Sequence, residues 1–290
     1  MCSYEVDLVE ITSANNSQFQ TVPGFFLQDD PLADPAMIGA VPARFALLDS
    51  SDTRWANLGA ELSRLNAAAD GNTSYKVIMF GRHGQGYHNV GEEKYGTKAW
   101  DDYWSKLNGD GELTWGPDAE LTTVGKDQAA AVNKLWKDEA VFGIPPPQKA
   151  YCSPMTRAMQ TNVITFAGIS SERTVVLEVN CREEYGEHTC DKRNTRTYIT
   201  DTFPQFDIET GFTEDDELWT AESRETGEHA AARAQQVLDR IFREDTDVTF
   251  LSITAHGGII NGFLRALGRP KYPLPTGGIL PVVVKATARV

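Results

Sequence analysis

The sequence is poor in cysteine and has no long apolar run. Its four cysteines, Cys2, Cys152, Cys181 and Cys190, are too few for a disulfide framework in 290 residues, and none belongs to a CxxC pair of the kind that binds zinc. We expect them to be reduced. No apolar run approaches the roughly 20 residues that span a bilayer, and the N-terminal residues lack the basic and apolar regions of a signal peptide. The sequence therefore predicts a cytoplasmic protein with no membrane partner.

Basic residues are outnumbered by acidic ones. The chain has 27 Lys and Arg against 41 Asp and Glu, a formal net charge of −14. A field of this sign repels polyanions, and no basic stripe typical of a nucleic-acid-binding surface is present. We therefore expect no nucleic-acid partner, and any anionic ligand must be bound by local cations.

Strands and helices are predicted to alternate from residue 75 onward. Short apolar runs predict buried strands over 76–80, 149–152, 174–178 and 248–255, and longer patterns predict helices over 124–137, 154–167, 227–243 and 259–267. A last strand is expected near 280–285, and its Pro281 suits a strand start or a sheet edge. This alternation predicts a three-layer α/β/α fold with a mainly parallel sheet.

The N-terminal part of the chain carries weaker signals. A strand is possible over residues 4–11, and a helix is expected to begin at Asp52 and to pack on the main domain. We interpret residues 1–75 as an N-terminal extension packed on the core and residues 76–290 as the main domain. A polar stretch over 184–223 interrupts the alternation and is expected to be an insertion.

Two histidines follow the ends of predicted strands. Arg82 and His83 come directly after the first buried strand and precede Gly84, while His256 follows the strand that ends at Ala255. Open parallel sheets bind ligands at the carboxyl ends of their strands. We therefore expect His83 and His256 to reach the same edge of the sheet.

A predicted helix start lies between the two histidines in the sequence. Ser153 is a good N-cap and Pro154 suits the first helical position, so this end should present free N–H groups to an anion. Arg157 lies one turn further on, and with Arg82 it could hold phosphate oxygens in bidentate fashion. A lone histidine is more often structural and a lone arginine more often a surface charge, but together these residues predict an oxyanion pocket.

Other motifs give weaker predictions. Gly84 and Gly86 lack the third glycine of a dinucleotide-binding loop. Cys190 and Arg196 have the Cys-x5-Arg spacing of thiolate phosphatases, but no strand precedes them. His188 and Cys190 could form half a metal site, yet a solvated loop is the simpler interpretation, and we expect no metal.

Taken together, these residues resemble the histidine phosphatase superfamily, in the phosphoglycerate-mutase-like branch, where Arg-His-Gly after the first strand is the signature. The chain is especially similar to a fungal and plant subgroup with Arg-His-Gly-Gln-Gly-x-His-Asn, here residues 82–89. The same subgroup has segments like residues 100–104, 118–129 and 182–193 of this chain. The likeness covers nearly the whole chain and implies the histidine phosphatase fold.

The resemblance also implies roles for single residues. His83 would be the nucleophile that becomes phosphohistidine. The phosphate pocket would be completed by Arg82, Asn89, Arg157, His256 and Gly257. This chemistry, in which imidazole attacks and cationic groups stabilise the phosphoryl oxygens, requires no metal and no other cofactor.

The proton donor to the leaving oxygen is implied to lie after the third strand. Glu183 matches the subgroup position, and we favour it. Glu184 is the alternative, because the spacing from the acid to Gly186 is one residue shorter than in the mutases. A carboxylic acid is needed here because the alkoxide must be protonated as it leaves.

The function that we expect is a phosphatase acting on a small phosphorylated metabolite. The alternatives are a phosphoglycerate-type mutase, for which Lys192 and Arg193 could supply cations, and a family member recruited to non-phosphate chemistry or to a binding role. Aromatic residues near Trp100 and Trp115 could line a site for the leaving group, although a structural role is more frequent for such side chains.

Overall fold

The computed structural model describes residues 17–169, 174–176 and 180–288. These residues form a fold built around one sheet of seven strands. The strands are β1 (Gln18–Thr21), β2 (Thr73–Arg82), β3 (Lys149–Cys152), β4 (Val175–Val176), β5 (Asp207–Ile208), β6 (Phe250–Ala255) and β7 (Ile279–Thr287). Their order across the sheet is β1-β7-β2-β6-β3-β4-β5. All neighbouring strands from β2 to β5 pair in parallel, whereas β7 is antiparallel to both β2 and β1.

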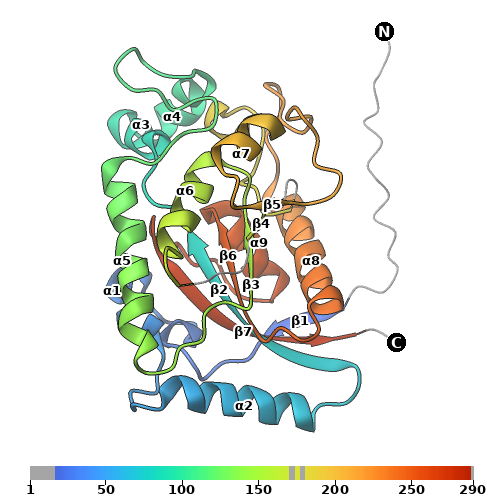
Figure 1. Cartoon of the computed structure of the whole chain (residues 1–290). Coiled ribbons are helices and arrows are strands. Elements are labelled where there is room, and N and C mark those ends of the chain that lie inside the picture. The colour runs from blue at the N-terminus through green and yellow to red at the C-terminus, as the bar shows by residue number, and fades with distance from the viewer. Residues whose placement is uncertain (1–16, 170–173, 177–179, 289–290) are drawn as a thin grey trace.

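Helices cover both faces of this sheet (Figure 1). The α-helices of the described residues are α1 (Pro35–Ile38), α2 (Arg54–Ala68), α3 (Tyr87–Tyr95), α4 (Thr97–Asp102), α5 (Thr123–Ala140), α6 (Thr156–Thr165), α7 (Arg196–Thr202), α8 (Gly227–Glu244) and α9 (Gly257–Ala266). The three-layer fold with a mainly parallel sheet, predicted from the sequence, is confirmed. No helix within the described ranges is both long and apolar enough to cross a membrane.

The buried run of β2 contacts both helical layers because successive side chains of a strand point to opposite faces. Ile78 and Phe80 belong to the core cluster that contains the apolar stripe of α8 and the buried residues of α9. Val77 and Met79 belong to a second cluster with residues of α2 and α5. A strand buried on both faces is uniformly apolar, which is the pattern that identified it in the sequence.

The N-terminal segment contributes to the same core. Trp55, Leu58 and Leu62 of α2 are buried in the cluster that holds Val77 and Met79. The helix begins one residue later than expected, since its N-cap is Thr53 rather than Asp52 and no side chain caps it. The strand considered over residues 4–11 lies outside the described residues, and β1, which the sequence did not predict, adds to the sheet beside β7.

Pro281 lies inside β7, which pairs with a strand on each side, so the expectation of an edge strand is only locally right. Ile279 donates its N–H to Ala40 O, and Val283 O accepts the N–H of Val22. The backbone N–H and C=O groups at these alternate positions of β7 therefore point away from β2. Pro281 shares this orientation, and β1 pairs only with residues from Val284 onward. The proline therefore stands where β7 has no neighbouring strand to receive an N–H.

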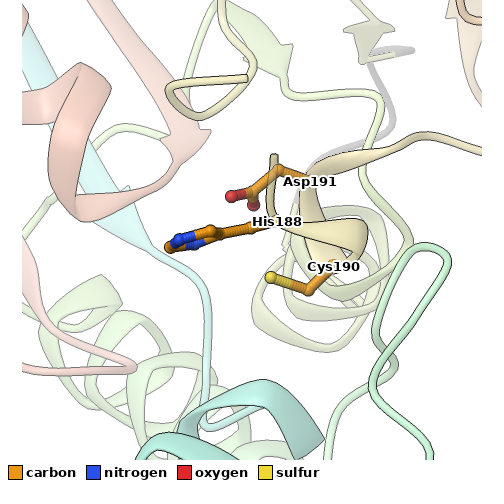
Figure 2. A group of neighbouring side chains, drawn as sticks. All are labelled: His188, Cys190 and Asp191. Atoms are coloured by element: carbon orange, nitrogen blue, oxygen red, sulfur yellow. The ribbon is translucent and has the colours of Figure 1, made fainter. Parts of the chain in front are cut away.

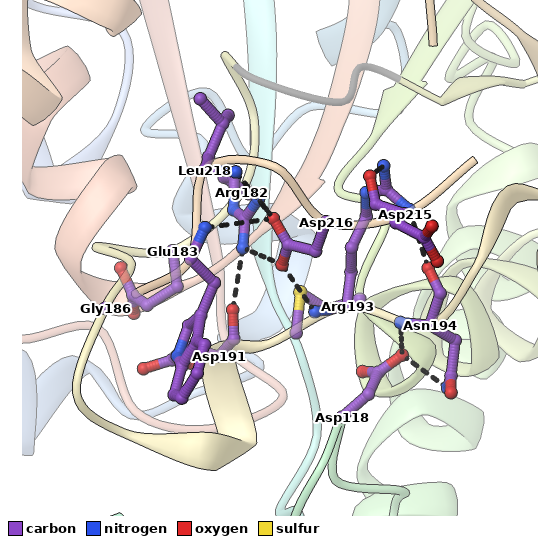
Figure 3. A network of polar contacts seen from close by, with 12 residues as sticks. Asp118, Arg182, Glu183, Gly186, Asp191, Arg193, Asn194, Asp215, Asp216 and Leu218 are labelled. Atoms are coloured by element: carbon purple, nitrogen blue, oxygen red, sulfur yellow. Dashed lines mark hydrogen bonds and ion pairs between the residues drawn. The ribbon is translucent and has the colours of Figure 1, made fainter. Parts of the chain in front are cut away.

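The polar stretch over 184–223 is held in place by buried ion pairs (Figure 3). Arg182 is fully buried and donates two hydrogen bonds of 2.7 Å to the carboxylate of Asp216. Asp216 also accepts the backbone N–H of Arg193, whose guanidinium is bound by backbone oxygens of residues 213–215. These contacts fix the segment that carries the turn over Thr189–Asp191 beside the carboxyl ends of the strands.

Candidate active site

The register of β2 and β6 brings the two histidines together. Arg82 pairs with Ala255 in this parallel ladder, so the residues that follow, His83 and His256, leave the sheet side by side. His83 also donates its backbone N–H to Ala255 O at 3.0 Å. The two imidazole rings lie 4.9 Å apart between centroids, and both side chains are buried.

The His83 ring is held in one tautomer. Its Nδ1 lies 2.7 Å from the carbonyl oxygen of Gly84, which can only accept, so Nδ1 carries the hydrogen and the lone pair is on Nε2. Burial, with the charges of Arg157 and Arg82 in addition, lowers the pKa of His83 well below its ordinary value. The ring is therefore neutral near pH 7 and able to act as a nucleophile.

Two guanidiniums lie beside His83. Arg157 is buried and donates to Cys190 O and to Asp191 Oδ1, each at 2.7 Å. Burial disfavours its charge, but Asp191 and other acidic neighbours outweigh burial and raise the pKa of Arg157. Arg82 donates from Nη1 to Leu274 O at 2.7 Å. The Nε atoms of both arginines are buried and have no partner among the described residues, as expected where a ligand oxygen is to be bound.

The predicted helix start at Ser153 and Pro154 is wrong. Helix α6 begins at Thr156, whose N–H and hydroxyl donate to Asp118 at 2.8 and 2.7 Å. The carboxylate of Asp118 comes from a distant segment and takes the place that the sequence assigned to the Ser153 hydroxyl. Ser153 Oγ accepts the N–H of Met155, at 3.3 Å, and it lies 2.7 Å from Nε2 of His256 and orients that ring.

Of the two candidate acids, Glu183 reaches the pocket. Its carboxylate accepts the backbone N–H groups of Gly258 and Ile259 at the start of α9, each at 3.1 Å. The approach is so close that a Cβ at Gly258 would lie 2.2 Å from Glu183 Oε1, so a larger residue there would displace the Glu183 carboxylate. Glu184 lies beside it, and burial, together with the charge of Glu183, raises its pKa.

An open cavity at the carboxyl ends of the strands collects most of the predicted residues. Its walls include Arg82, His83, Asn89, Arg157 and Glu183. Asn89 also accepts the N–H of Gly86 through Oδ1 at 3.0 Å, which shapes the start of α3.

Three of the candidates do not line this cavity. His256 packs against the ring of His83. Gly257 lies against the guanidinium of Arg82, since a Cβ at this position would be 3.5 Å from Arg82 Cζ. Glu184 is absent from the cavity wall as well.

Several residues that line the cavity were missed by the sequence analysis. They are His88, Glu92, Asp101, Asp191 and Arg224. Trp100, His188 and Cys190 also line it, and the sequence had suggested them only for a leaving-group site and for half of a metal site. His88 and Asp191 fall inside the quoted family segments, so those segments carried a signal for them. Arg224 follows the polar stretch without any motif, and it donates to Asp191 Oδ2 at 3.2 Å. Nothing in the local sequence indicates this contact.

The segment around Cys190 is not the solvated loop that we expected. His188, Cys190 and Asp191 are all buried, because Arg157, Arg182 and Arg224 bind the oxygens of this turn. Burial raises the pKa of Cys190 well above its ordinary value, with Asp191 adding to the effect. The thiol is therefore protonated near pH 7, which argues against the thiolate phosphatase chemistry that the Cys-x5-Arg spacing suggested. The other described cysteines, Cys152 and Cys181, are also free and buried.

The aromatic residues near Trp100 mainly form a small core. Trp100 and Trp115 are buried, with ring centroids 5.2 Å apart, and Trp104 packs against them. Only Trp100 of this group also lines the cavity. Tyr103 is exposed. The structural role, which the sequence analysis took as the more frequent one, accounts for most of this cluster.

Comparisons with known proteins agree with the fold. The model of the histidine phosphatase superfamily (branch 1) matches residues 78–277. A probable phosphoglycerate mutase of Arthroderma benhamiae is 42% identical over 92% of this chain and 84% of its own length. Phosphomutase-like protein 3 of Candida albicans is 31% identical over 94% and 82%. Among solved structures, the ecdysone phosphate phosphatase of Bombix mori in complex with tungstate is 15% identical over 71% of this chain and 88% of that chain, with a TM-score of 0.48.

Proposed function

The chain belongs to the histidine phosphatase superfamily, and on this premise we propose that it is a metal-independent phosphatase that hydrolyses a small phosphomonoester through a phosphohistidine on His83. The observation that carries the proposal is the fixed tautomer of His83. With Nδ1–H bonded to Gly84 O, the neutral ring has its lone pair on Nε2, in the cavity that the guanidiniums of Arg82 and Arg157 also line.

In the first step, Nε2 of His83 attacks phosphorus in line with the leaving oxygen. The P–N bond forms, the bond from phosphorus to the ester oxygen breaks, and Glu183 gives its proton to that oxygen. Arg82 and Arg157 stabilise the charge on the remaining phosphoryl oxygens. Asn89, which lines the same cavity, adds a phosphate contact.

In the second step, water replaces the alcohol. The Glu183 carboxylate takes a proton from this water, whose oxygen attacks phosphorus as the P–N bond breaks. Inorganic phosphate leaves, His83 returns to its neutral form, and Glu183 is again protonated for the next cycle. His256, 4.9 Å from His83 between ring centroids, supports the phosphohistidine ring from behind.

The outer wall of the cavity favours a substrate with a single phosphate. Two carboxylates, Glu92 and Asp101, line the cavity beside the proposed phosphate ligands. The cations that could have bound a second anionic group are engaged elsewhere, because Lys192 lies 4.8 Å from the ring of Trp219 and Arg193 is bound by backbone oxygens. A substrate whose leaving group is neutral or cationic therefore suits this wall better than a substrate that carries a further carboxylate.

A phosphoglycerate-type mutase is the second candidate, and the names of the fungal relatives favour it. A mutase must protect its phosphohistidine from water while the phosphorylated intermediate reorients in the active site. That calls for cations that hold the second anionic group, and in the described part of the cavity only Arg224 is left for this, itself paired with Asp191. We therefore favour hydrolysis.

A screen of phosphorylated metabolites separates the two candidates. Phosphate release and 3- to 2-phosphoglycerate conversion, primed with bisphosphoglycerate, are measured on the same preparation, with His83→Ala as the control for contaminating activity. We expect phosphate release from a simple monoester and little isomerisation. Efficient isomerisation, with phosphate release only as a minor side reaction, would reverse the assignment.

A further inference from the structure

Three side chains of different ligand type converge on one wall of the cavity. His188, Cys190 and Asp191 extend from a single turn toward the same space, as Figure 2 shows. One ligand atom from each, an imidazole nitrogen, the Sγ and a carboxylate oxygen, lies within 4.8 Å of the other two. All three residues are buried, although the turn carries no apolar side chain other than Cys190.

This arrangement approaches the geometry of a tetrahedral zinc site. Bond lengths of about 2.0 Å to nitrogen or oxygen and about 2.3 Å to sulfur place the ligand atoms of such a site about 3.5 Å apart. The ligand atoms of the three side chains therefore need to approach one another by about 1.3 Å at most. Asp101 adds a carboxylate oxygen 3.6 Å from His188 Nε2, across the cavity mouth.

The charges of the cavity wall also suit a cation. Its guanidiniums belong to Arg82, Arg157 and Arg224, whereas its carboxylates belong to Glu92, Asp101, Glu183 and Asp191. With the Cys190 thiolate that forms on binding, this wall carries five negative charges against three positive ones, which balances the charge of a divalent ion.

The geometry points to a site for a soft divalent cation, Zn²⁺ in the first place, formed by His188, Cys190 and Asp191. Imidazole, thiolate and carboxylate together are typical of zinc, and Mg²⁺ or Ca²⁺ would not select the sulfur. On binding, the Cys190 thiol releases its proton to solvent, because the ion supplies the charge that stabilises the thiolate.

Occupation of this site inhibits the phosphatase. Asp191 is the carboxylate that holds Arg157, with Oδ1 2.7 Å from Nη2, so an ion bound to Asp191 competes with the guanidinium that contacts phosphate. This consequence rests on the proposed function, whereas the site itself does not.

Cobalt(II) titration of the full chain tests the site without any activity assay. We expect one ion per chain, with a thiolate-to-cobalt charge-transfer band in the near ultraviolet and intense visible bands of tetrahedral coordination, both displaced by Zn²⁺. Cys190→Ser should abolish the charge-transfer band. The matched control is Cys181→Ser, which removes another buried thiol that lies in the helical core and should keep the band.

A band that persists in Cys190→Ser, or is lost in Cys181→Ser, would place the ion elsewhere and overturn the proposal, as would the absence of any thiolate band in the wild type. If Cys190→Ser fails to fold, His188→Gln provides the same test, since it must weaken cobalt binding at least tenfold. For the inhibition, Zn²⁺ should suppress phosphate release and EDTA should restore it. Full activity at saturating Zn²⁺ would refute the inhibition alone, and a chain that binds cobalt but releases no phosphate would count against the proposed function alone.

Discussion

His83 and His256 lie with their ring centroids 4.9 Å apart because each is the first residue after one of two neighbouring parallel strands. Their separation is thus set by the spacing of β2 and β6 and by the pairing of Arg82 with Ala255. A nucleophile at this position can be held in one orientation with little support from the loops.

The first prediction concerns the proton donor. Glu183→Gln should reduce turnover of alkyl phosphates by about 10²- to 10⁴-fold, the usual contribution of a general acid. Aryl phosphates, whose leaving oxygen needs little protonation, should be affected far less. Rates for a series of leaving groups measure this difference.

Glu184→Gln is the matched control, because Glu184 is the neighbouring carboxyl and does not line the cavity. It should leave the dependence on the leaving group as in the wild type. If Glu184→Gln shows the steep dependence and Glu183→Gln does not, the assignment of the acid is off by one residue.

A second prediction concerns the buried pair of Arg182 and Asp216. Their side chains are 0% and 1% exposed, so Asp216→Asn leaves a buried guanidinium without its counter-ion. We expect the free energy of unfolding to fall by about 3–5 kcal/mol. Urea unfolding monitored by tryptophan fluorescence gives the value.

The control for this pair is Asp102→Asn, which removes the partner of Lys98 in an exposed ion pair. Exposed pairs contribute little to stability, so no clear change is expected. Equal effects of the two substitutions would show that burial of the Arg182 pair has been misjudged.

The third prediction concerns pH and His88, which is partly buried. Burial, followed by the charge of Arg157, lowers the pKa of His88 well below its ordinary value. Below pH 6.5 the unfolded chain binds a proton at this residue and the folded chain does not. Stability is therefore lost as the pH falls, by up to about 1.4 kcal/mol per pH unit for one group.

His88→Gln should remove this part of the pH dependence. The free energies of unfolding of the variant and the wild type, measured from pH 7 to pH 5, should converge or cross in favour of the variant as the pH falls. Curves that stay parallel would mean that His88 titrates normally in the folded state.

Those parts of the site that follow strand ends could be predicted from the sequence. Apolar runs located β2 and β6, and the residues after them, His83 and His256, lie together as expected. The start of α6 could not be predicted in this way, because its N–H groups bind Asp118, which is about 40 residues away. A local rule for helix caps selects the nearest hydroxyl, in this case Ser153.

The segment around Cys190 was misjudged for a similar reason. Its residues are polar, and polarity over a long stretch is typical of a solvated loop. Here the polar groups satisfy each other, since Arg182, Arg157 and Arg224 all bind oxygens of the turn at Thr189–Asp191. Their partners are 9 to 34 residues away along the chain, so no local pattern reveals them.

The central claim is that phosphate passes through His83, and rapid quenching of the enzyme with ³²P-labelled substrate tests it most directly. The account predicts a phosphoryl group that is labile in acid and stable in base, located by peptide mapping on His83 and absent from His83→Ala, whose turnover should fall by about 10³-fold or more. Label on Cys190 or on a serine, or turnover that continues at the wild-type rate in His83→Ala, would contradict it.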